Sequence, residues 1–166
     1  MAKVVFKVGD DVSTDIIYPG RFMATVLPTE TPQYAFIDYP EFNAKIKKNE
    51  FPPQSIIVGG KNFGCGSSRE QAASCLKGPD FVVIAPNFSR IFLQNAINLG
   101  LKMVICPTIE ANEGDELEIT TDQVINRSSG KNFPIIALPK ARQAIIDAGG
   151  LIPFARKLVV DAKGGR

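Results

Sequence analysis

Two adjacent serines and an arginine, Ser67, Ser68 and Arg69, follow a glycine-rich run at residues 59–66. Hydroxyl groups donate and accept hydrogen bonds at short range, and the planar guanidinium of arginine can grip a carboxylate through two parallel bonds. Glycine lets the backbone approach a ligand closely and adopt positive φ values that other residues avoid. These residue types in this order predict an anion-binding site, with a carboxylate as a suitable occupant.

The elements on either side of this run would position it. Residues 56–58 (IIV) form a short apolar run typical of a buried strand, and the residues after the glycines predict a helix opened by Ser67 and Ser68, with Arg69 in its first turn. Free amides and the positive end of the dipole at a helix start favour an anion. The alternative is purely structural: Ser67 caps the helix, Glu70 completes a capping box, and Arg69 is a solvated side chain.

Further strands and helices alternate along the chain. Apolar runs at residues 3–8, 81–85 and 101–106 predict buried strands, and residues 90–99 have the periodicity of a helix that ends at Gly100. This order indicates an α/β fold whose sheet is at least partly parallel.

The C-terminal third has a different texture. Residues 115–138 are typical of a β-meander, residues 140–147 predict a final helix, and the polar tail from Val160 is expected to be frayed. Nothing resembles a linker between domains, so we expect one domain over residues 1–166.

Composition excludes several classes of protein. The formal net charge is only +2 and the basic residues are scattered, which argues against a nucleic-acid partner. No apolar run is long enough to span a membrane and no signal-peptide core is evident, so we expect a cytoplasmic protein. The chain contains 3 cysteines without a CxxC pair and no histidine, so we expect no metal site of its own. Any acid–base chemistry must therefore use other groups.

Cysteine positions add detail. Cys75 and Cys106 are expected to act as small buried hydrophobic residues, whereas Cys65 lies within the glycine turn. The turn leaves two interpretations of Cys65 open, a spacer or a reactive thiol.

Four segments, taken together, resemble a known family. GDDVSTDIIYPGRFM, GGKNFGCGSSREQAASCLK, NFSRIFLQNAINLGL and GGLIPFARK occur in this order across nearly the full length. They resemble the small subunit of 3-isopropylmalate dehydratase, a hydro-lyase of the aconitase superfamily that acts in leucine biosynthesis. The resemblance implies a three-layer β/β/α fold like the swivelling domain of aconitase. It also implies activity only with a large subunit that carries a four-iron-four-sulfur cluster.

The resemblance implies roles for the serine turn. Ser67 corresponds to the serine alkoxide that removes and returns a proton on the carbon next to a carboxylate, and Ser68 and Arg69 would hold a carboxylate of the substrate. Such a serine must be activated by turn amides, the helix dipole and cations in a dry interface. Supporting roles fall to Asp15, Gly64 and Gly66.

The same resemblance bears on the substrate, a small hydroxy di- or tricarboxylic acid. In relatives the loop after Arg21 determines specificity, and here it contains Phe22, Met23 and Ala24 without a cation. This composition favours the isopropyl group of isopropylmalate. Gln71 resembles homoaconitase small subunits instead, so homoaconitate stays an alternative, as does 2,3-dimethylmalate. A remoter alternative is a stand-alone module that binds an anion or a nucleotide, although no acidic residue follows a second strand at the spacing expected for a ribose contact.

Overall fold

The computed structural model describes residues 1–164, which contain a curled sheet of seven strands in the order β4-β3-β2-β1-β5-β6-β7. Strands β1 to β4 run parallel, and β5 to β7 form an antiparallel meander joined to β1, as predicted. The strands are β1 (Ala2–Lys7), β2 (Ile56–Val58), β3 (Val82–Ala85), β4 (Lys102–Ile105), β5 (Glu116–Ile119), β6 (Gln123–Asn126) and β7 (Lys131–Pro134).

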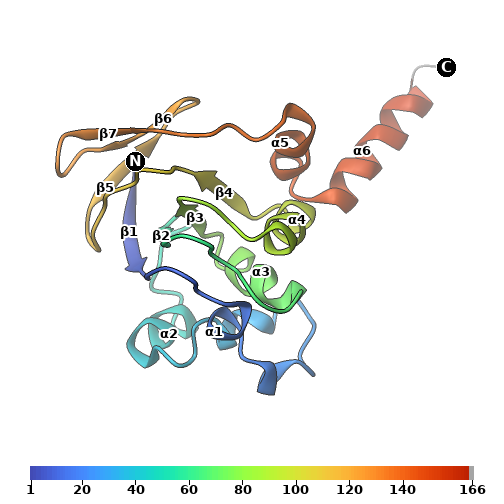
Figure 1. The fold of residues 1–166 in the computed structure, drawn as a ribbon. Helices are drawn as coiled ribbons and strands as arrows, with labels where there is room; N and C mark the ends of the chain where they lie inside the picture. Colours follow the sequence, from blue (N-terminus) through green and yellow to red (C-terminus); the bar gives the residue numbers. More distant parts are fainter. Residues whose placement is uncertain (165–166) are drawn as a thin grey trace.

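Helices cover one face of the parallel strands, and the meander covers the other (Figure 1). The helices are α1 (Thr14–Ile17), η1 (Gly20–Phe22), η2 (Thr31–Tyr34), α2 (Pro40–Lys47), α3 (Glu70–Lys77), α4 (Arg90–Leu99), α5 (Lys140–Asp147) and α6 (Leu151–Gly164). Gly100 ends α4 in the left-handed conformation, with φ of 73°, as predicted.

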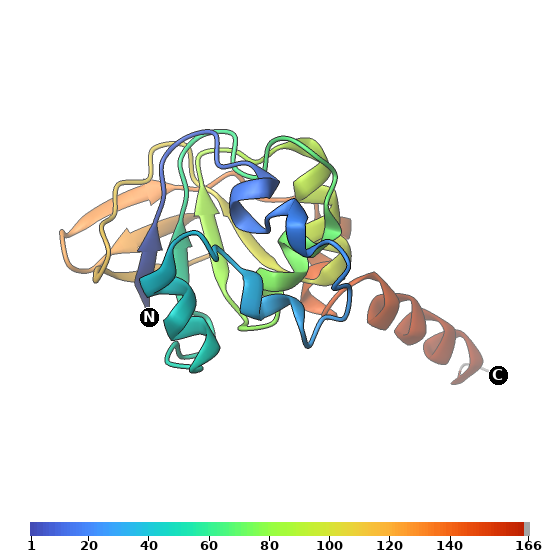
Figure 2. The same ribbon diagram turned by 90° about the horizontal axis from the view of Figure 1, so that it is seen from below.

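Two hydrophobic cores separate the three layers. On the helix side, β-strand residues such as Ile57 and Val83 pack with Leu76 of α3 and Ile97 of α4. On the opposite side, alternate strand residues such as Ile56 pack with residues of the meander. Because successive side chains of a strand point to opposite faces, a continuous apolar run supplies both cores. The fold is therefore the predicted three-layer β/β/α arrangement, with its helices in the foreground in Figure 2.

Loops from the carboxyl ends of the parallel strands meet at one edge of the sheet. Isolated bridges join Ser13 to Cys65 and Phe63 to Phe88, and so connect the segments that follow β1, β2 and β3. In sheets of this kind ligands bind beyond the carboxyl ends of the strands. The glycine-serine turn, which follows β2, lies in such a position.

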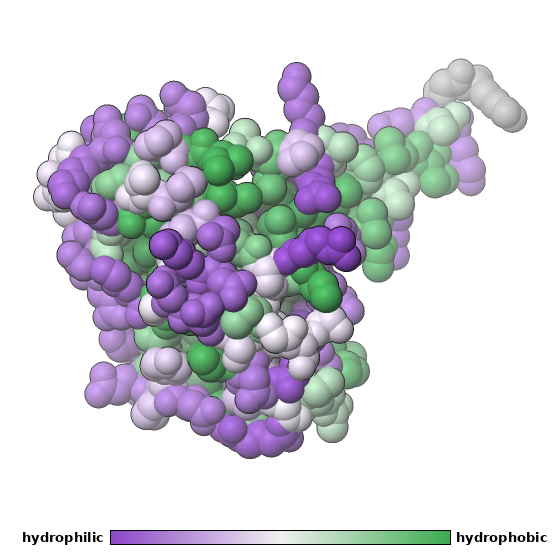
Figure 3. Space-filling view, viewed as in Figure 1, coloured by the Kyte–Doolittle hydropathy of each residue, from purple (hydrophilic) through white to green (hydrophobic). Residues whose placement is uncertain are grey.

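The C-terminal segment differs from the prediction. The tail expected to be frayed from Val160 continues a 14-residue helix, α6, as far as Gly164; residues 165–166 lie outside the described part. Residues 155–158 (ARKL) have good helix propensity and favour the first part of this helix, and the helix continues through Val160. The helix projects from the body in Figure 1, and Ile152 and Val160 are among its exposed apolar residues. Green apolar surface lies along this helix in Figure 3.

Candidate active site

Two glycines shape the turn between β2 and α3. Gly64 and Gly66 have φ values of +79° and +90°, which side chains rarely adopt. A Cβ atom at Gly64 would also lie 2.2 Å from Cγ of Phe92, so the backbone touches that ring directly. Gly59 and Gly60, the first glycines of the run, do not have positive φ values. Conformational freedom and close packing are thus both required at Gly64.

Neither serine serves as a helix cap. Helix α3 begins at Glu70, and its N-cap is Arg69, without a side-chain hydrogen bond to the helix. The expectation that Arg69 lies in the first helical turn is therefore wrong by one residue, and the capping interpretation of Ser67 does not hold. Ser67 and Ser68 are exposed, and within the described residues neither hydroxyl makes a hydrogen bond. Both hydroxyls are available to a ligand.

Helix α1 contacts the backbone of the turn at Cys65 and Ser67. The Thr14 amide donates to the Cys65 carbonyl over 2.8 Å, and the buried Thr14 hydroxyl donates to the Ser67 carbonyl over 2.8 Å. Ser13 caps α1 by accepting a hydrogen bond from the Ile16 amide. The hydrogen bond from the Thr14 hydroxyl joins residues 53 positions apart in the chain. The cap orients α1, and α1 in turn positions the backbone of Ser67.

Asp15 and Arg69 form an ion pair beside the turn. The Asp15 carboxylate accepts from Nη1 of Arg69 and, over 2.8 Å, from the Gly20 amide. Nη1 of Arg69 also donates to the Tyr18 carbonyl over 3.2 Å. The hydrogen bond from Arg69 and the Gly20 amide lower the pKa of Asp15 below its ordinary value. Asp15 therefore stays ionised and fixes the orientation of the guanidinium.

One donor of this guanidinium is unpaired. Among buried side-chain nitrogen and oxygen atoms of the described residues, Nε of Arg69 alone has no hydrogen-bond partner. A buried donor without a partner costs about 1–3 kcal/mol. An acceptor atom that reached this N–H would remove that cost.

The loop predicted to contact substrate lies next to α3. Phe22 is half-buried and stacks on Tyr34 at 4.3 Å between ring centroids, whereas Met23 and Ala24 are exposed. The Gln71 side-chain amide donates to the Met23 carbonyl over 3.5 Å. The structure thus places Ser67, Ser68 and Arg69 at the N-terminal end of α3, where Asp15 contacts Arg69 and the loop contacts Gln71.

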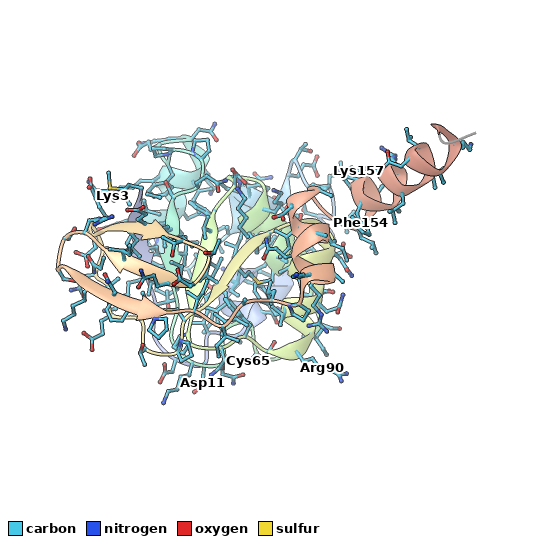
Figure 4. The ribbon with its side chains drawn as sticks, turned by 90° about the horizontal axis from the view of Figure 1, so that it is seen from above. Lys3, Asp11, Cys65, Arg90, Phe154 and Lys157 are labelled. Atoms are coloured by element: carbon cyan, nitrogen blue, oxygen red, sulfur yellow. The ribbon has the colours of Figure 1, made fainter. Side chains whose placement is uncertain are left out.

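The cysteines differ in exposure. Cys75 and Cys106 are fully buried, as predicted, and burial raises the pKa of the Cys106 thiol to about 11 and that of Cys75 even further. Cys65 is partly exposed, and its thiol donates to the Asp11 carbonyl over 3.4 Å. Figure 4 shows Cys65 and Asp11 at one edge of the molecule, with Arg90 further along it.

The serine turn is open to solvent. A groove of about 640 Å³ is lined by β4, residues 135–138 and α5, and two smaller grooves also lie away from residues 64–69.

Within residues 1–164 no group of three or more His, Cys, Asp or Glu residues is placed to hold a metal ion, and no helix is both long and apolar enough to cross a membrane.

Two residues of this site were not predicted from the sequence, Thr14 and Tyr18. Both are fully or almost fully buried, and each forms a hydrogen bond to a backbone carbonyl of a distant or neighbouring loop. Their spacing in the sequence carries no signal for such contacts. Tyr18 follows two isoleucines, whereas Thr14 lies between Ser13 and Asp15 and looks like an ordinary polar residue.

Comparison with known proteins defines the class of this domain. Residues 11–107, which include α1, the loop and the serine turn, match the family "Aconitase C-terminal domain".

The similarity to individual proteins extends over almost the whole chain. The 3-isopropylmalate dehydratase small subunit of Methanosarcina mazei is 45% identical over 93% of this chain and 95% of its own length. The isopropylmalate/citramalate isomerase small subunit of Methanocaldococcus jannaschii is 42% identical over 96% of this chain and 95% of its own. A crystal structure of a 3-isopropylmalate dehydratase from the same organism superposes with a TM-score of 0.89 at 34% identity, covering 99% of this chain and 98% of that one. The chain therefore belongs to the family of 3-isopropylmalate dehydratase small subunits within the aconitase superfamily.

Proposed function

We propose that this chain is the small subunit of a two-subunit hydro-lyase that dehydrates isopropylmalate and rehydrates the product at the adjacent carbon. One observation carries the proposal: two unengaged serine hydroxyls lie beside an arginine whose guanidinium is oriented by Asp15 and retains an unpaired buried donor. A carboxylate would satisfy these donors. The names of the relatives at 45% and 42% identity support isopropylmalate as the substrate.

In this proposal Ser68 and Arg69 bind a substrate carboxylate, and Ser67 removes a proton from the carbon next to it. The same serine then returns the proton to the adjacent carbon. A serine hydroxyl in water is too weak an acid for this role, so a neighbouring cation must stabilise the alkoxide of Ser67, and its effect is strongest where water is excluded. Arg69 is the cation at hand, but Ser67 is exposed in this chain. Water must therefore be excluded by another chain, which is the place of the large subunit.

The side chains of this subunit do not fit an iron-sulfur cluster. The chain contains no histidine, and the described residues include no cluster of potential metal ligands. We therefore assign the four-iron-four-sulfur cluster to the large subunit, where it would supply a Lewis acid for the hydroxyl of the substrate. The role of this chain is to bind the carboxylate, move the proton and contribute an apolar wall.

That wall consists of Phe22, Met23 and Ala24. The neighbouring cation, Arg21, pairs with Asp38 over 2.5 Å and lies 4.9 Å from the Phe22 ring centroid. An extra substrate carboxylate buried against this wall would lack a partner, whereas each buried carbon of an isopropyl group contributes about 0.8 kcal/mol. The wall therefore favours isopropylmalate over homoaconitate.

Gln71 does not change this preference. Its amide is uncharged and donates to the Met23 carbonyl, so it offers no cation to a third carboxylate. Dimethylmalate meets the same apolar wall and stays an alternative. Citramalate is supported by a specific observation, the name of the relative from Methanocaldococcus jannaschii. Citramalate carries a methyl group in place of the isopropyl group and would contact less of the apolar wall.

We also assign a cytoplasmic location. All three cysteines are free, although two of them lie in the buried core and one is partly exposed. Free thiols are typical of a reducing compartment.

The proposal is tested by assembly with the large subunit from the same organism under anaerobic conditions. Formation of the unsaturated acid should be followed from isopropylmalate, citramalate, homoaconitate and dimethylmalate. Ser67→Ala should lower kcat by about 10²–10⁴-fold, the usual contribution of a general base. Ser68→Ala, one residue away and also exposed, should instead raise KM. Normal turnover by Ser67→Ala would refute the role of Ser67, and absence of activity on all four acids would refute the proposed reaction.

A further inference from the structure

Tyr18 is a fully buried tyrosine with polar contacts at both its side chain and its backbone. It follows α1 as its C-cap, and its ring packs edge-on against Tyr34 at 6.0 Å between centroids. Its hydroxyl lies 3.0 Å from the Phe22 carbonyl and 3.2 Å from the Thr25 carbonyl, and donates its one proton to this pair. Tyr18 thus holds both ends of the short segment 22–25.

The backbone of the same residue contacts the arginine. The Tyr18 carbonyl accepts a hydrogen bond from Nη1 of Arg69 over 3.2 Å. Gly20, two residues on, donates its amide to Asp15, and a Cβ atom there would lie 3.0 Å from Nη2 of Arg69. A single buried residue therefore connects the guanidinium to the backbone of the apolar loop.

Besides local backbone hydrogen bonds from the amides of Phe22, Met23 and Thr25, few polar contacts restrain this loop. Among the described residues, the hydroxyl of Tyr18 and the amide of Gln71 are the two side-chain donors to the carbonyls of residues 22–26. The Gln71 contact is long, at 3.5 Å, and Gln71 is only partly buried. The side chains of Met23 and Val26 are 45% and 64% exposed, so packing does not hold them in place. The Tyr18 hydroxyl is the principal buried restraint.

We propose that Tyr18 is a positioning residue that sets the distance between the carboxylate-binding arginine and the apolar wall, and thereby the size of the substrate side chain. The inference rests on the proposed function, because it takes Arg69 and the loop as substrate contacts. Burial raises the pKa of Tyr18 above its ordinary value, so the hydroxyl keeps its proton at neutral pH and acts as a donor. Tyr18 touches no reacting atom.

The consequence is a selective effect on substrates with a large side chain. A looser loop would lose contact with an isopropyl group, while a methyl group makes little contact to lose. The two groups differ by two carbons, and a loop that packs on both carbons would discriminate between them by roughly 15-fold. Loss of the restraint should reduce this ratio, whereas general destabilisation would lower the active fraction for both substrates equally.

The experiment compares Tyr18→Phe with Tyr39→Phe in the assembled enzyme. Tyr39 is 40% exposed and serves as the control for removal of a tyrosine hydroxyl, because its ring packs with Phe6 and Phe36 and its hydroxyl makes no hydrogen bond within the described residues. In Tyr18→Phe, KM for isopropylmalate should rise about three- to tenfold, as expected for one lost hydrogen bond. KM for citramalate and kcat for both substrates should change less than about twofold, within the scatter of a substitution that removes no contact.

A second measurement is independent of catalysis. Amide hydrogen exchange in the full-length isolated chain should be about three- to tenfold faster at residues 22–27 in Tyr18→Phe, and unchanged in Tyr39→Phe. Unchanged exchange in Tyr18→Phe would overturn the inference whatever the activity. Equal losses on both substrates would also overturn it, because they would indicate a structural role only. Wild-type enzyme inactive on both acids would instead refute the proposed function, leaving the exchange result to decide the restraint.

Discussion

Replacement of Gly64 by alanine is expected to destabilise this protein more than the same replacement at Gly66. Both glycines have positive φ, so each substitution incurs a conformational cost of about 1–2 kcal/mol. At Gly66 nothing lies closer than 3.7 Å to the added Cβ atom, so no further cost arises. At Gly64 the added atom would lie 2.2 Å from Cγ of Phe92. Such an overlap must be relieved by movement of the ring or of the turn.

Phe92 has little room to move. It is 1% exposed, and its ring packs against Phe63 at 5.4 Å and Phe88 at 6.3 Å. Overpacking in a close-packed core costs about 1–3 kcal/mol, and this cost falls on Gly64→Ala alone. For a chain of this length 1 kcal/mol corresponds to about 2–4 °C in Tm, so Gly64→Ala should melt roughly 2–12 °C below Gly66→Ala.

Thermal and urea unfolding of both variants, followed by circular dichroism, measure this difference. Phe92→Leu provides a further check, because a smaller side chain removes part of the overlap. The double variant Gly64→Ala with Phe92→Leu should therefore be less destabilised than the two single effects together predict. Equal stability of the Gly64 and Gly66 variants, or strict additivity in the double variant, would refute the overlap argument.

Three further predictions concern titration and the support of the turn. A thiol reagent at neutral pH should modify Cys65 in the folded chain and all 3 cysteines in denaturant, because Cys75 and Cys106 are buried and burial raises the pKa of Cys106 to about 11. A second rapidly modified thiol in the folded chain would contradict this prediction. The folded pKa of Asp15 is lowered, so its pairing with Arg69 stabilises the protein above about pH 4 and is lost as the pH falls through the lowered pKa. The Asp15 side chain of this pair is largely exposed, so Asp15→Asn should lower the free energy of unfolding in urea by less than about 1 kcal/mol at neutral pH. A difference in stability from wild type that persisted at pH 2 would count against the pairing. Thr14→Val should lower the free energy of unfolding by about 1 kcal/mol and should also lower kcat of the assembled enzyme. Thr14→Ser keeps the hydroxyl and should retain both values. Equal effects of the two substitutions would exclude the hydroxyl as the cause.

The sequence alone determined the local elements and the family. Apolar runs and helical periodicity depend on neighbouring residues, so β2, β3, β4 and α4 were predicted within one or two residues. The order of these elements indicated a partly parallel sheet because strands that alternate with helices usually run parallel. Glycines, serines and an arginine in one short segment indicated the anion site, since these types are needed together for close approach and charge. The resemblance to known small subunits rested on the same segments.

Tertiary structure decided how the site is supported. Thr14 and Asp15 contact the turn from 53 and 54 residues away, and Tyr18 reaches Arg69 across 51 residues. These pairs meet because parallel strands bring their carboxyl ends to one edge of the sheet, and no local pattern encodes which side chains then touch. The start of α3 at Glu70 and the helix at the C-terminus also escaped prediction. Helix ends depend on competing backbone contacts, here a hydrogen bond from the Arg69 amide to the Ser67 carbonyl, which only the folded chain supplies.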